Sequence, residues 1–228
     1  MALLKKINYL HNTYAPANII FSLILAKFNK GKVMRPYLKS QSDYRSMLKS
    51  LDISNDWFTN NIPYWLYAFN KYNLLSKKIN ALEIGSWEGV SSYFILYSLP
   101  NAQLTCVDTW EGAEEHKTGD ATTEDVLSNI EASFNKNLSP FTDRLTKYKG
   151  TSFSFFNKNY EKNIFDVIYV DGSHHCNDVI VDAVKGFELL KIGGIMIFDD
   201  YLWQYYSKDI DNPAAAINVF FKTKTRFL

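Results

Sequence analysis

From residue 79 onward the chain alternates short apolar runs with stretches of helical periodicity, and this alternation restricts the possible folds most strongly. The apolar runs have the length of strands and cover residues 79–84, 103–107, 144–150, 164–170 and 194–198, of which 144–150 is the weakest. Helical stretches lie between and after them, at 89–98, 122–137, 151–158, 176–191 and 213–221. Strands buried on both faces read as continuous apolar runs, and regular helical crossovers imply a mostly parallel sheet. The sequence therefore predicts an α/β, doubly wound fold.

The first 75 residues show a different pattern, in which helices are joined by loops. "NIIFSLILAKF" predicts a short apolar helix, and "SDYRSMLKSL" begins with a Ser/Asp cap. In "DWFTNNIPYWLYAFNKY" the aromatic residues lie near helical spacing but are interrupted by Pro63. A length of 228 residues suits one large domain with a small appendage. We therefore expect an N-terminal helical extension or lid over residues 1–75 and a ligand-binding domain over residues 76–228.

The charge distribution argues against nucleic acid as a partner. The formal net charge is only +1, although residues 1–50 hold nine Lys or Arg against the single acid Asp43, so they carry +8 and the remainder −7. This basic arm could contact an anionic surface, but a solvated helical extension is the simpler interpretation. The apolar run at 17–26 is about half as long as the roughly 20 residues that a membrane span needs. Membrane association is therefore not expected.

The cysteines and the N-terminal residues indicate a cytoplasmic protein. Cys106 and Cys176 form neither a disulfide framework nor a CxxC pair, which suits a reducing compartment. The residues "HNTYAPAN" ahead of the apolar run do not suit a signal peptide.

The first predicted strand ends in "ALEIGSWEGVSS", where Glu83 closes the strand and Gly85 and Gly89 flank the turn into a helix. Parallel sheets bind ligands beyond the carboxyl ends of their strands, and glycines at a helix N-terminus let a ligand approach the backbone. Trp87 breaks the G-x-G-x-x-G fingerprint of nicotinamide-binding proteins. An acid in front of the turn would repel a diphosphate but suits a ligand with an ammonium group. A tight turn with only a structural role is the alternative.

The next two strand ends favour a nucleoside ligand. Asp108 closes "AQLTCVD", 25 positions after Glu83, where a carboxylate can accept hydrogen bonds from both hydroxyls of a ribose. It could instead cap the following turn. In "YKGTSFSFF", Gly150 and Ser152 precede a helix, which Ser152 could cap, or Ser152 could contact an adenine ring. The pairing of Glu83 with Asp108 makes the nucleoside interpretation the better one.

Three carboxylates are expected to converge at the last two strand ends. Asp171 closes "FDVIYVD", and Asp199 and Asp200 follow "LLKIGGIMIF". Like charges at adjacent strand ends repel each other unless a cation neutralises them, and oxygen ligands favour Mg²⁺ or a similar divalent ion. Zinc is less suitable because the sequence lacks a four-ligand Cys/His spacing. Acids that merely cap loops are the alternative.

On these residues the chain resembles the class I S-adenosylmethionine-dependent methyltransferases, most of all the metal-dependent O-methyltransferases of the macrocin and catechol types. The resemblance covers about residues 79–221. "LEIGSWEGVSS" is similar to the first motif of the family, "CVDTW" to its ribose-binding strand end and "GTS" to its adenine-contacting turn. "VDGSHH" and "GGIMIFDDY" are the most specific matches. The resemblance implies a Rossmann-like methyltransferase fold that binds S-adenosylmethionine and Mg²⁺ or a similar divalent cation.

The resemblance also implies roles for individual residues. The cofactor-binding residues would be Glu83, Gly85, Ser86, Trp87, Gly89, Ser91, Asp108, Thr109, Trp110, Ser152 and Asp171, with Ser91 helping to hold the methionine carboxylate. The metal ligands would be Asp171, Asp199 and Asp200, and the catalytic residues would be His174 and Asp171.

The implied mechanism assigns the proton transfer to His174, three residues after Asp171. At that position the catechol enzymes have a lysine and the macrocin type has a histidine. The cation would lower the pKa of a substrate hydroxyl, His174 would take its proton, and the oxyanion would attack the methyl group in line. His175 is expected to have a packing or surface role. Cys176 is not needed as a nucleophile, because direct methyl transfer requires no covalent intermediate.

Two other function classes fit part of the pattern. A nucleotide-sugar glycosyltransferase would also use paired acids to hold a divalent ion, but it has no use for the E-x-G-x-x-x-G turn. A non-catalytic binding protein of the same fold would not need to retain Glu83, Asp108 and Asp171. For the methyl acceptor we prefer, by analogy with the fold family alone, a sugar hydroxyl in a pocket walled by the N-terminal helices and by Trp203, Tyr205 and Tyr206.

The end of the sequence predicts a sheet with few strands. Only "KTKTRFL" follows the helix near 213–221, which is too short for the sixth and antiparallel seventh strands usual in this class. We therefore expect five parallel strands, at most six, and a C-terminus that is short for the fold. An exposed sheet edge would favour pairing with a second chain, so a homodimer is expected.

Overall fold

The computed structural model describes residues 3–118, 122–158 and 161–224. It contains a five-stranded sheet made of β1 (Ile79–Ile84), β2 (Ala102–Asp108), β3 (Leu145–Lys149), β4 (Phe165–Val170) and β5 (Leu190–Phe198). The strand order is β3-β2-β1-β4-β5, and every neighbouring pair is parallel. This order confirms the predicted doubly wound α/β fold and its five parallel strands. Residues 225–228, the last part of the short C-terminus, lie outside the described residues.

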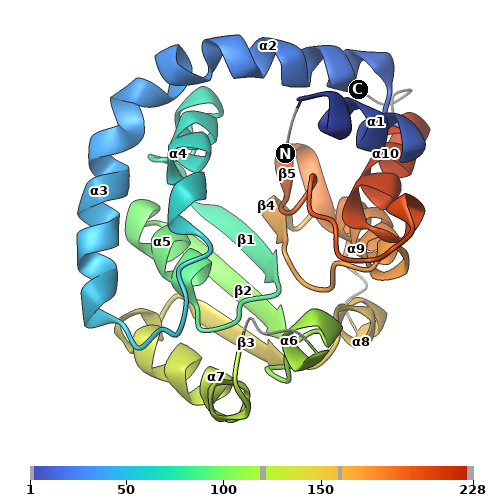
Figure 1. Cartoon of the computed structure of the whole chain (residues 1–228). Helices are drawn as coiled ribbons and strands as arrows, with labels where there is room; N and C mark the ends of the chain where they lie inside the picture. The colour runs from blue at the N-terminus through green and yellow to red at the C-terminus, as the bar shows by residue number, and fades with distance from the viewer. Residues whose placement is uncertain (1–2, 119–121, 159–160, 225–228) are drawn as a thin grey trace.

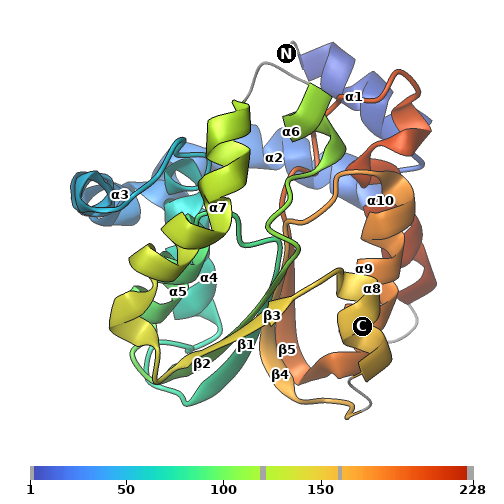
Figure 2. The same ribbon diagram turned by 90° about the horizontal axis from the view of Figure 1, so that it is seen from below.

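Helices cover both faces of the sheet (Figure 1 and Figure 2). One face carries α4 (Ile62–Lys71), α5 (Val90–Ser98) and α7 (Glu124–Asn137), and the other carries α8 (Ser152–Lys158), α9 (Cys176–Leu189) and α10 (Pro213–Lys224). Because successive side chains of a strand point to opposite faces, Ala81 packs with the first set and Leu82 with the second. The strands are therefore apolar on both sides, as their continuous apolar runs predict.

The N-terminal helices run around the outside of this core. Figure 1 shows α1 (Leu3–Asn12), α2 (Ala17–Met34) and α3 (Leu38–Met47) as an arc that starts beside α10 and reaches the α4 side of the sheet. Tyr9 and Leu10 of α1 pack against Ala214 of α10, and Asn218 donates a hydrogen bond to the backbone oxygen of Thr13 at 2.9 Å. The two ends of the described chain are thus held together.

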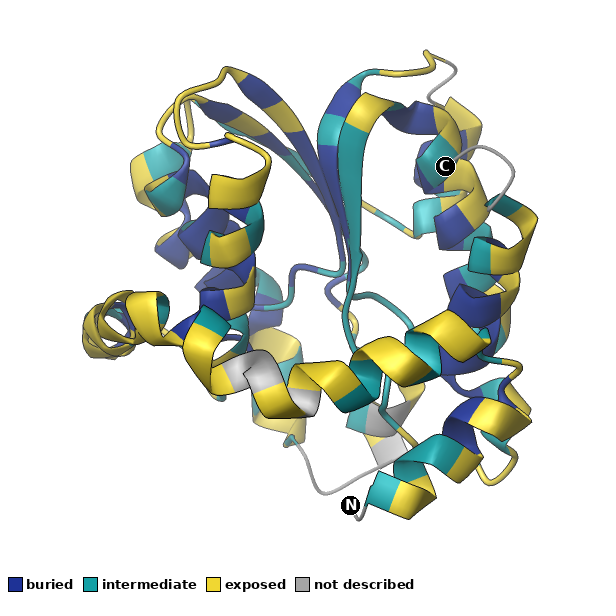
Figure 3. Ribbon diagram, turned by 90° about the horizontal axis from the view of Figure 1, so that it is seen from above, coloured by how far each residue is buried: buried dark blue, intermediate teal, exposed yellow. Residues whose placement is uncertain are grey.

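Much of α2 is exposed, as Figure 3 shows. Within the described ranges, no helix is both long enough and apolar enough to cross a membrane. The remaining short helices are α6 (Glu114–Thr118), η1 (Arg35–Tyr37), η2 (Leu48–Ser50), η3 (Thr59–Asn61), η4 (Ser139–Phe141) and η5 (Asp209–Asp211).

Two local predictions need correction, and one short helix was not predicted. Pro63 does not interrupt a helix but lies in the first turn of α4, where its missing N–H costs no hydrogen bond. The helix predicted to extend to residue 191 ends at Leu189, and β5 begins at Leu190. Both leucines are buried, so the apolar pattern in the sequence continues across the end of α9 and gives no sign of where the helix stops. The short helix α6 had no recognisable sequence signal.

The register of the sheet brings the strand ends together. Ile84 of β1 pairs with Val107 of β2 and with Val170 of β4, which in turn pairs with Phe198 of β5. The residue that follows each of these strands therefore lies beside its neighbour at one edge of the sheet.

Candidate functional site

A cavity of about 860 Å³ lies at the carboxyl ends of the strands. Its wall contains residues from the turns after all five strands, together with residues from the loop before η3 and from α6. Eight of the predicted cofactor residues line it: Gly85, Ser86, Trp87, Ser91, Asp108, Thr109, Ser152 and Asp171. The predicted catalytic and metal residues His174, Asp199 and Asp200 also line it. The structure does not place Glu83, Gly89 or Trp110 in the cavity wall.

The turn after β1 is held against β2 by the carboxylate of Asp108. One oxygen of Asp108 accepts hydrogen bonds from the backbone N–H groups of Ser86 at 2.7 Å and Trp87 at 2.9 Å. The other oxygen accepts from the backbone N–H of Trp110 at 2.7 Å. Asp108 therefore caps the turn, which is one of the two roles that the sequence left open. The other role, a contact with ribose hydroxyls, is compatible with it because Asp108 also lines the cavity.

Glu83 lies beneath this turn and not in the cavity wall, so direct ligand contact by its carboxylate is not what the structure shows. Its side chain is fully buried, and Oε2 accepts hydrogen bonds from the hydroxyls of Ser86, at 2.8 Å, and Ser92. The Cys106 thiol lies 3.3 Å from the same oxygen. Burial raises the pKa of Glu83, and the surrounding serine hydroxyls oppose that rise. Glu83 thus stabilises the turn between β1 and α5 through hydrogen bonds to Ser86 and Ser92.

Gly89 and Trp110 also support the site indirectly. Gly89 has φ +84°, and a Cβ there would lie 2.3 Å from the Leu138 side chain, so the residue provides helix packing. Trp110 is buried, and its indole N–H donates to the backbone oxygen of Trp87 at 3.0 Å. Both residues stabilise the walls of the cavity without facing it.

The turn after β3 forms another part of the wall. Thr151 caps α8, because its hydroxyl accepts the backbone N–H of Ser154 at 3.1 Å, so the cap role considered for Ser152 belongs to its neighbour. Ser152 instead lies near Asp182 of α9, whose pKa the Ser152 hydroxyl lowers against the larger effect of burial. The backbone N–H of Gly150 donates to the backbone oxygen of Asp108 at 2.8 Å, so the β2 and β3 turns form a continuous surface.

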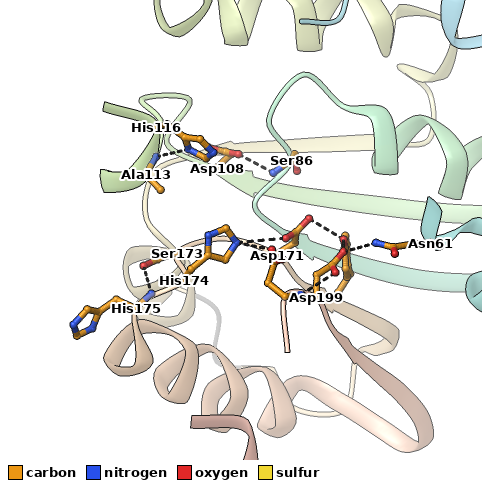
Figure 4. Close-up of polar contacts among 12 residues, drawn as sticks. Asn61, Ser86, Asp108, Ala113, His116, Asp171, Ser173, His174, His175 and Asp199 are labelled. Atoms are coloured by element: carbon orange, nitrogen blue, oxygen red, sulfur yellow. Dashed lines mark hydrogen bonds and ion pairs between the residues drawn. The ribbon is translucent and has the colours of Figure 1, made fainter. Parts of the chain in front are cut away.

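The acids after β4 and β5 gather around Tyr169 and His174. Figure 4 shows Asp171, Asp199 and His174 close together. The Tyr169 hydroxyl lies 2.8 Å from Asp171 Oδ2 and 2.5 Å from Asp199 Oδ2. His174 Nε2 lies 2.8 Å from Asp200 Oδ2 and 3.9 Å from Asp171 Oδ1. The predicted convergence of three carboxylates is therefore present, with a histidine and a tyrosine inside it.

The proton balance of this group is unusual. A phenol has one proton, so Tyr169 can donate to only one of its two carboxylate neighbours, and the second contact needs a proton on that carboxyl group. The pKa of Asp171 is raised to about 7, mainly by burial; His174 lowers it, and the nearby acids Asp199 and Asp200 oppose that lowering. Burial also raises the pKa of Asp199. Without a cation, the group therefore holds a proton near neutral pH.

Three side chains of this group have ligand atoms close enough together to hold a metal ion. Asp171, His174 and Asp200 each offer one ligand atom, and these atoms lie within 4.8 Å of one another. Both carboxylate oxygens of Asp199 already accept hydrogen bonds. Oδ2 accepts from the side-chain amide of Asn61 at 2.9 Å, and Oδ1 accepts from the backbone N–H of Asp200 at 2.9 Å. Two carboxylates suit hard ions such as Mg²⁺ or Mn²⁺, and the imidazole nitrogen adds affinity for softer ions.

His175 does not join this group. It is the N-cap of α9, its Nδ1 accepts the backbone N–H of Asn177 at 3.3 Å, and its ring lies 5.0 Å from that of Tyr206. Figure 4 shows its ring turned away from His174 and Asp171. Tyr206 is likewise absent from the cavity wall, whereas Trp203 and Tyr205 line it.

Sequence reasoning missed four residues of the site: Asn61, His116, Tyr169 and Asp182. Tyr169 had a usable signal, since it stands two positions before Asp171 and therefore shares its face of the strand. His116 stacks against Trp57, with ring centroids 5.5 Å apart and planes at 17°. Asn61 comes from η3, ahead of the first strand, and His116 from the short helix α6 after β2, and neither segment carries a local pattern that points to the site.

Comparison with protein families matches the chain to one of them. A family model described as a methyltransferase domain matches residues 82–201, which include every predicted cofactor-binding, metal-binding and catalytic residue. No curated protein matches the sequence of the chain.

Solved structures similar in fold include three methyltransferases. The O-methyltransferase from Bacillus cereus in complex with S-adenosylhomocysteine is 15% identical, with 86% of this chain and 79% of that chain covered and a TM-score of 0.51. The O-methyltransferase TomG from Streptomyces achromogenes, involved in tomaymycin synthesis and in complex with S-adenosylmethionine, is 14% identical, with 82% and 76% covered and a TM-score of 0.50.

The third similar structure is the MycE methyltransferase of the mycinamycin biosynthetic pathway, in complex with Mg, S-adenosylhomocysteine and mycinamycin VI. It is 15% identical with a TM-score of 0.51, and the match covers 78% of this chain but 45% of that chain. At such identities the likeness extends to the fold alone.

Proposed function

The chain belongs to the family defined by this methyltransferase domain, and from that membership we propose that it is an S-adenosylmethionine-dependent O-methyltransferase acting on a hydroxyl of a small molecule or sugar. The observation that carries the proposal is the single cavity that joins the Asp108 turn to the group around Asp171 and His174. Methyl donor and acceptor must share one enclosed space, because the methyl group passes directly between them.

The turns after β1, β2 and β3 are proposed to bind the donor. Three backbone N–H groups fix the carboxylate of Asp108, and its remaining lone pairs can accept hydrogen bonds from ribose hydroxyls. Ser91, at the start of α5, is the candidate contact for the methionine carboxylate, and Ser152 faces the adenine end. Glu83 contributes by holding Ser86 and Ser92 in place.

His174 is proposed to accept the proton of the acceptor hydroxyl at Nε2. The Asp200 carboxylate, 2.8 Å away, would stabilise the imidazolium that forms. Trp203, whose ring lies 4.6 Å from that of His174, fixes the imidazole from one side.

Asp171 and Asp200 would hold a divalent cation, with Asp199 or His174 as the third protein ligand. When bound, such a cation supplies Lewis-acid stabilisation of negative charge on the acceptor oxygen. The two candidates for the third ligand have different consequences, because a histidine nitrogen that binds the cation cannot also accept a proton. If His174 is the base, its removal should leave divalent affinity largely intact.

The acceptor is proposed to lie among aromatic side chains at the mouth of the cavity. Trp203 and Tyr205 are stacked with ring centroids 5.4 Å apart, and Trp57, from the N-terminal segment, also lines the cavity. Flat aromatic surfaces suit the apolar face of a sugar or another ring. We propose that residues 1–75 form this part of the acceptor pocket and that the enzyme takes a small-molecule or sugar acceptor.

Calorimetry with S-adenosylhomocysteine tests the assignment. We expect binding of S-adenosylhomocysteine and no comparable binding of UDP, which a glycosyltransferase would retain. An acceptor screen with a labelled methyl donor, run with and without Mg²⁺, would then identify the substrate. Failure of the native protein to bind S-adenosylhomocysteine would overturn the proposal.

A further inference from the structure

Tyr169 is a buried tyrosine beside the acid group for which the proposed reaction has no direct use. It lies on β4, and only 1% of its surface is exposed. Its ring packs edge-on against Trp65, with centroids 4.8 Å apart and planes at 85°, and Phe58 packs on it as well. A side chain enclosed in a packed core keeps one rotamer, so the position of its hydroxyl is fixed.

The Tyr169 hydroxyl lies between two carboxylates. Tyr169 pairs with Ile197 across β4 and β5, so Asp171 and Asp199, each two positions further on, lie side by side on the same face of the sheet. The hydroxyl is 2.8 Å from Asp171 Oδ2 and 2.5 Å from Asp199 Oδ2. Figure 4 shows Asn61 directed at Asp199, where its amide donates to the same Oδ2 at 2.9 Å. The protein itself therefore engages both Oδ2 atoms.

This arrangement leaves Asp171 with one oxygen for a cation. Its Oδ1 lies 3.9 Å from His174 Nε2 and so faces the other candidate ligands, whereas Oδ2 stays with Tyr169. Divalent ions differ in what they ask of a carboxylate. Ca²⁺ takes six to eight oxygen ligands in a flexible geometry and often binds both oxygens of one carboxylate, whereas Mg²⁺ requires a near-ideal octahedron.

We infer that Tyr169 is a positioning residue that holds Asp171 as a one-oxygen ligand and so makes the cation site select Mg²⁺ over Ca²⁺. This inference rests on the proposed function, which places a divalent cation at Asp171 and Asp200. Without the hydroxyl, the Asp171 carboxylate could turn and present both oxygens, which suits Ca²⁺ better than Mg²⁺. Side chains that orient metal ligands in this way typically change metal affinity by about 10- to 100-fold.

Calorimetric titration of the full chain with Mg²⁺ and with Ca²⁺ tests the inference. We expect native protein to bind Mg²⁺ more tightly than Ca²⁺. In Tyr169→Phe, which keeps the ring and removes only the hydroxyl, the ratio of Mg²⁺ to Ca²⁺ affinity should fall by about 10-fold or more. Removing the hydroxyl also changes the repulsion between the two acids, but that change acts on both ions alike and cancels in the ratio.

Tyr44→Phe is the matched control. Tyr44 is also buried, and its hydroxyl donates to the backbone oxygen of Val90 at 2.6 Å, away from the acid group. Its affinity ratio should stay at the native value. An unchanged ratio in a folded Tyr169→Phe protein would overturn the inference, as would equal shifts in the two variants.

The native protein alone provides a further test, which does not depend on the folding of any variant. Equal affinities for Mg²⁺ and Ca²⁺ would overturn the inference. Native protein that binds neither ion would remove the cation from the proposed function, and the inference with it. Titration with S-adenosylhomocysteine separates these outcomes from failure of the methyltransferase assignment, because the donor is assigned to other turns of the cavity.

Discussion

His174 and His175 are neighbours in the chain, but only one of them reaches the site. His174 follows the tight Gly-Ser turn and brings Nε2 to 2.8 Å from Asp200, whereas His175 is committed to the N-terminus of α9. The pair therefore offers an internal control for the proposed base.

His174→Ala should lower methyl transfer by roughly 10²–10⁴, the usual contribution of a positioned general base. S-adenosylhomocysteine affinity should remain near the native value, because His174 is assigned to the acceptor side. Turnover and calorimetry of both variants provide the measurement. His175→Ala should behave like the native protein, and the opposite ranking of the two variants would reverse the choice of base.

Asp182 should make stability fall as the pH rises. Burial raises its pKa from 3.8 to about 7, so the folded protein binds the proton more tightly than the unfolded chain. The resulting stabilisation is complete below the unfolded pKa and is lost as the pH rises through about 7. The Asn variant cannot titrate and serves as the reference. Relative to Asp182→Asn, the unfolding free energy of native protein should fall by roughly 1.4 kcal/mol per pH unit from about pH 5 to 7 and level off by about pH 8, a total loss of about 3 kcal/mol.

Urea unfolding of both proteins at several pH values measures this difference. A free-energy difference that stays constant across the range would contradict the assignment. Asp178→Asn, on the same helix, serves as the control for the loss of a carboxylate from this wall.

At the level of elements, the site depends on how closely the β1–α5 turn approaches the end of β4. Gly85 has φ +84°, and a Cβ at this position would lie 2.0 Å from the backbone oxygen of Asp171. No side chain can occupy that space, because the obstacle is backbone and cannot rotate away. The glycine therefore fixes the distance between the donor turn and the acid group.

Gly85→Ala should destabilise the protein by more than about 4 kcal/mol, a size reserved for severe local conflicts. Gly193→Ala is the matched control, since Gly193 has φ +80° but nothing within 4 Å of the position of a Cβ. It should cost only the conformational penalty of about 1–2 kcal/mol. Thermal unfolding of both variants gives the comparison, and equal losses would show that conformation, not close packing, limits Gly85.

At the scale of the whole molecule, the acid group connects the N-terminal helices to the sheet. The Asn61 side chain, at the end of η3, donates to Asp199, and the Tyr9 hydroxyl donates to the backbone oxygen of Trp203 at 3.0 Å. Ligands and cations bound at the site should therefore affect the stability of the entire chain.

Methyl transfer should be lost in EDTA and recover when Mg²⁺ is added. Asp199→Ala should lose both activity and the response to Mg²⁺, because its carboxylate lies beside the proposed cation site and is tied to Tyr169 and Asn61. S-adenosylhomocysteine at 100 times its dissociation constant should stabilise native protein by about 2.7 kcal/mol. Full activity in EDTA would remove the cation from the mechanism.

The sheet edges predict self-association through β5. At the other edge, β3 carries Lys147 and Lys149, the kind of charged side chains that protect an edge strand. The described part of β5 pairs only with β4, and its Ile192 is 99% exposed. Sedimentation should show a dimer that Ile192→Lys weakens, whereas Lys147→Ala should leave it intact. A native monomer at micromolar concentration would contradict this prediction.

The sequence alone determined the strands, their parallel arrangement and most of the cavity wall. Continuous apolar runs separated by helical periodicity allow few folds, and an acid or glycine directly after a strand must lie at the carboxyl edge. Asp108 could be predicted for this reason because it closes a strand, and Asp171, Asp199 and Asp200 because they directly follow strands, whereas His174 was identified through the family resemblance.

The tertiary structure decided which atoms face the cavity. Glu83 satisfied the sequence pattern but points into the core, because strand alternation and the packing of Ser86 and Ser92 set its direction. Asn61 and Asp182 reach the site from other helices, and no local pattern records such contacts between segments distant in sequence. Local periodicity specifies elements and their ends, whereas side-chain direction depends on packing against distant parts of the chain.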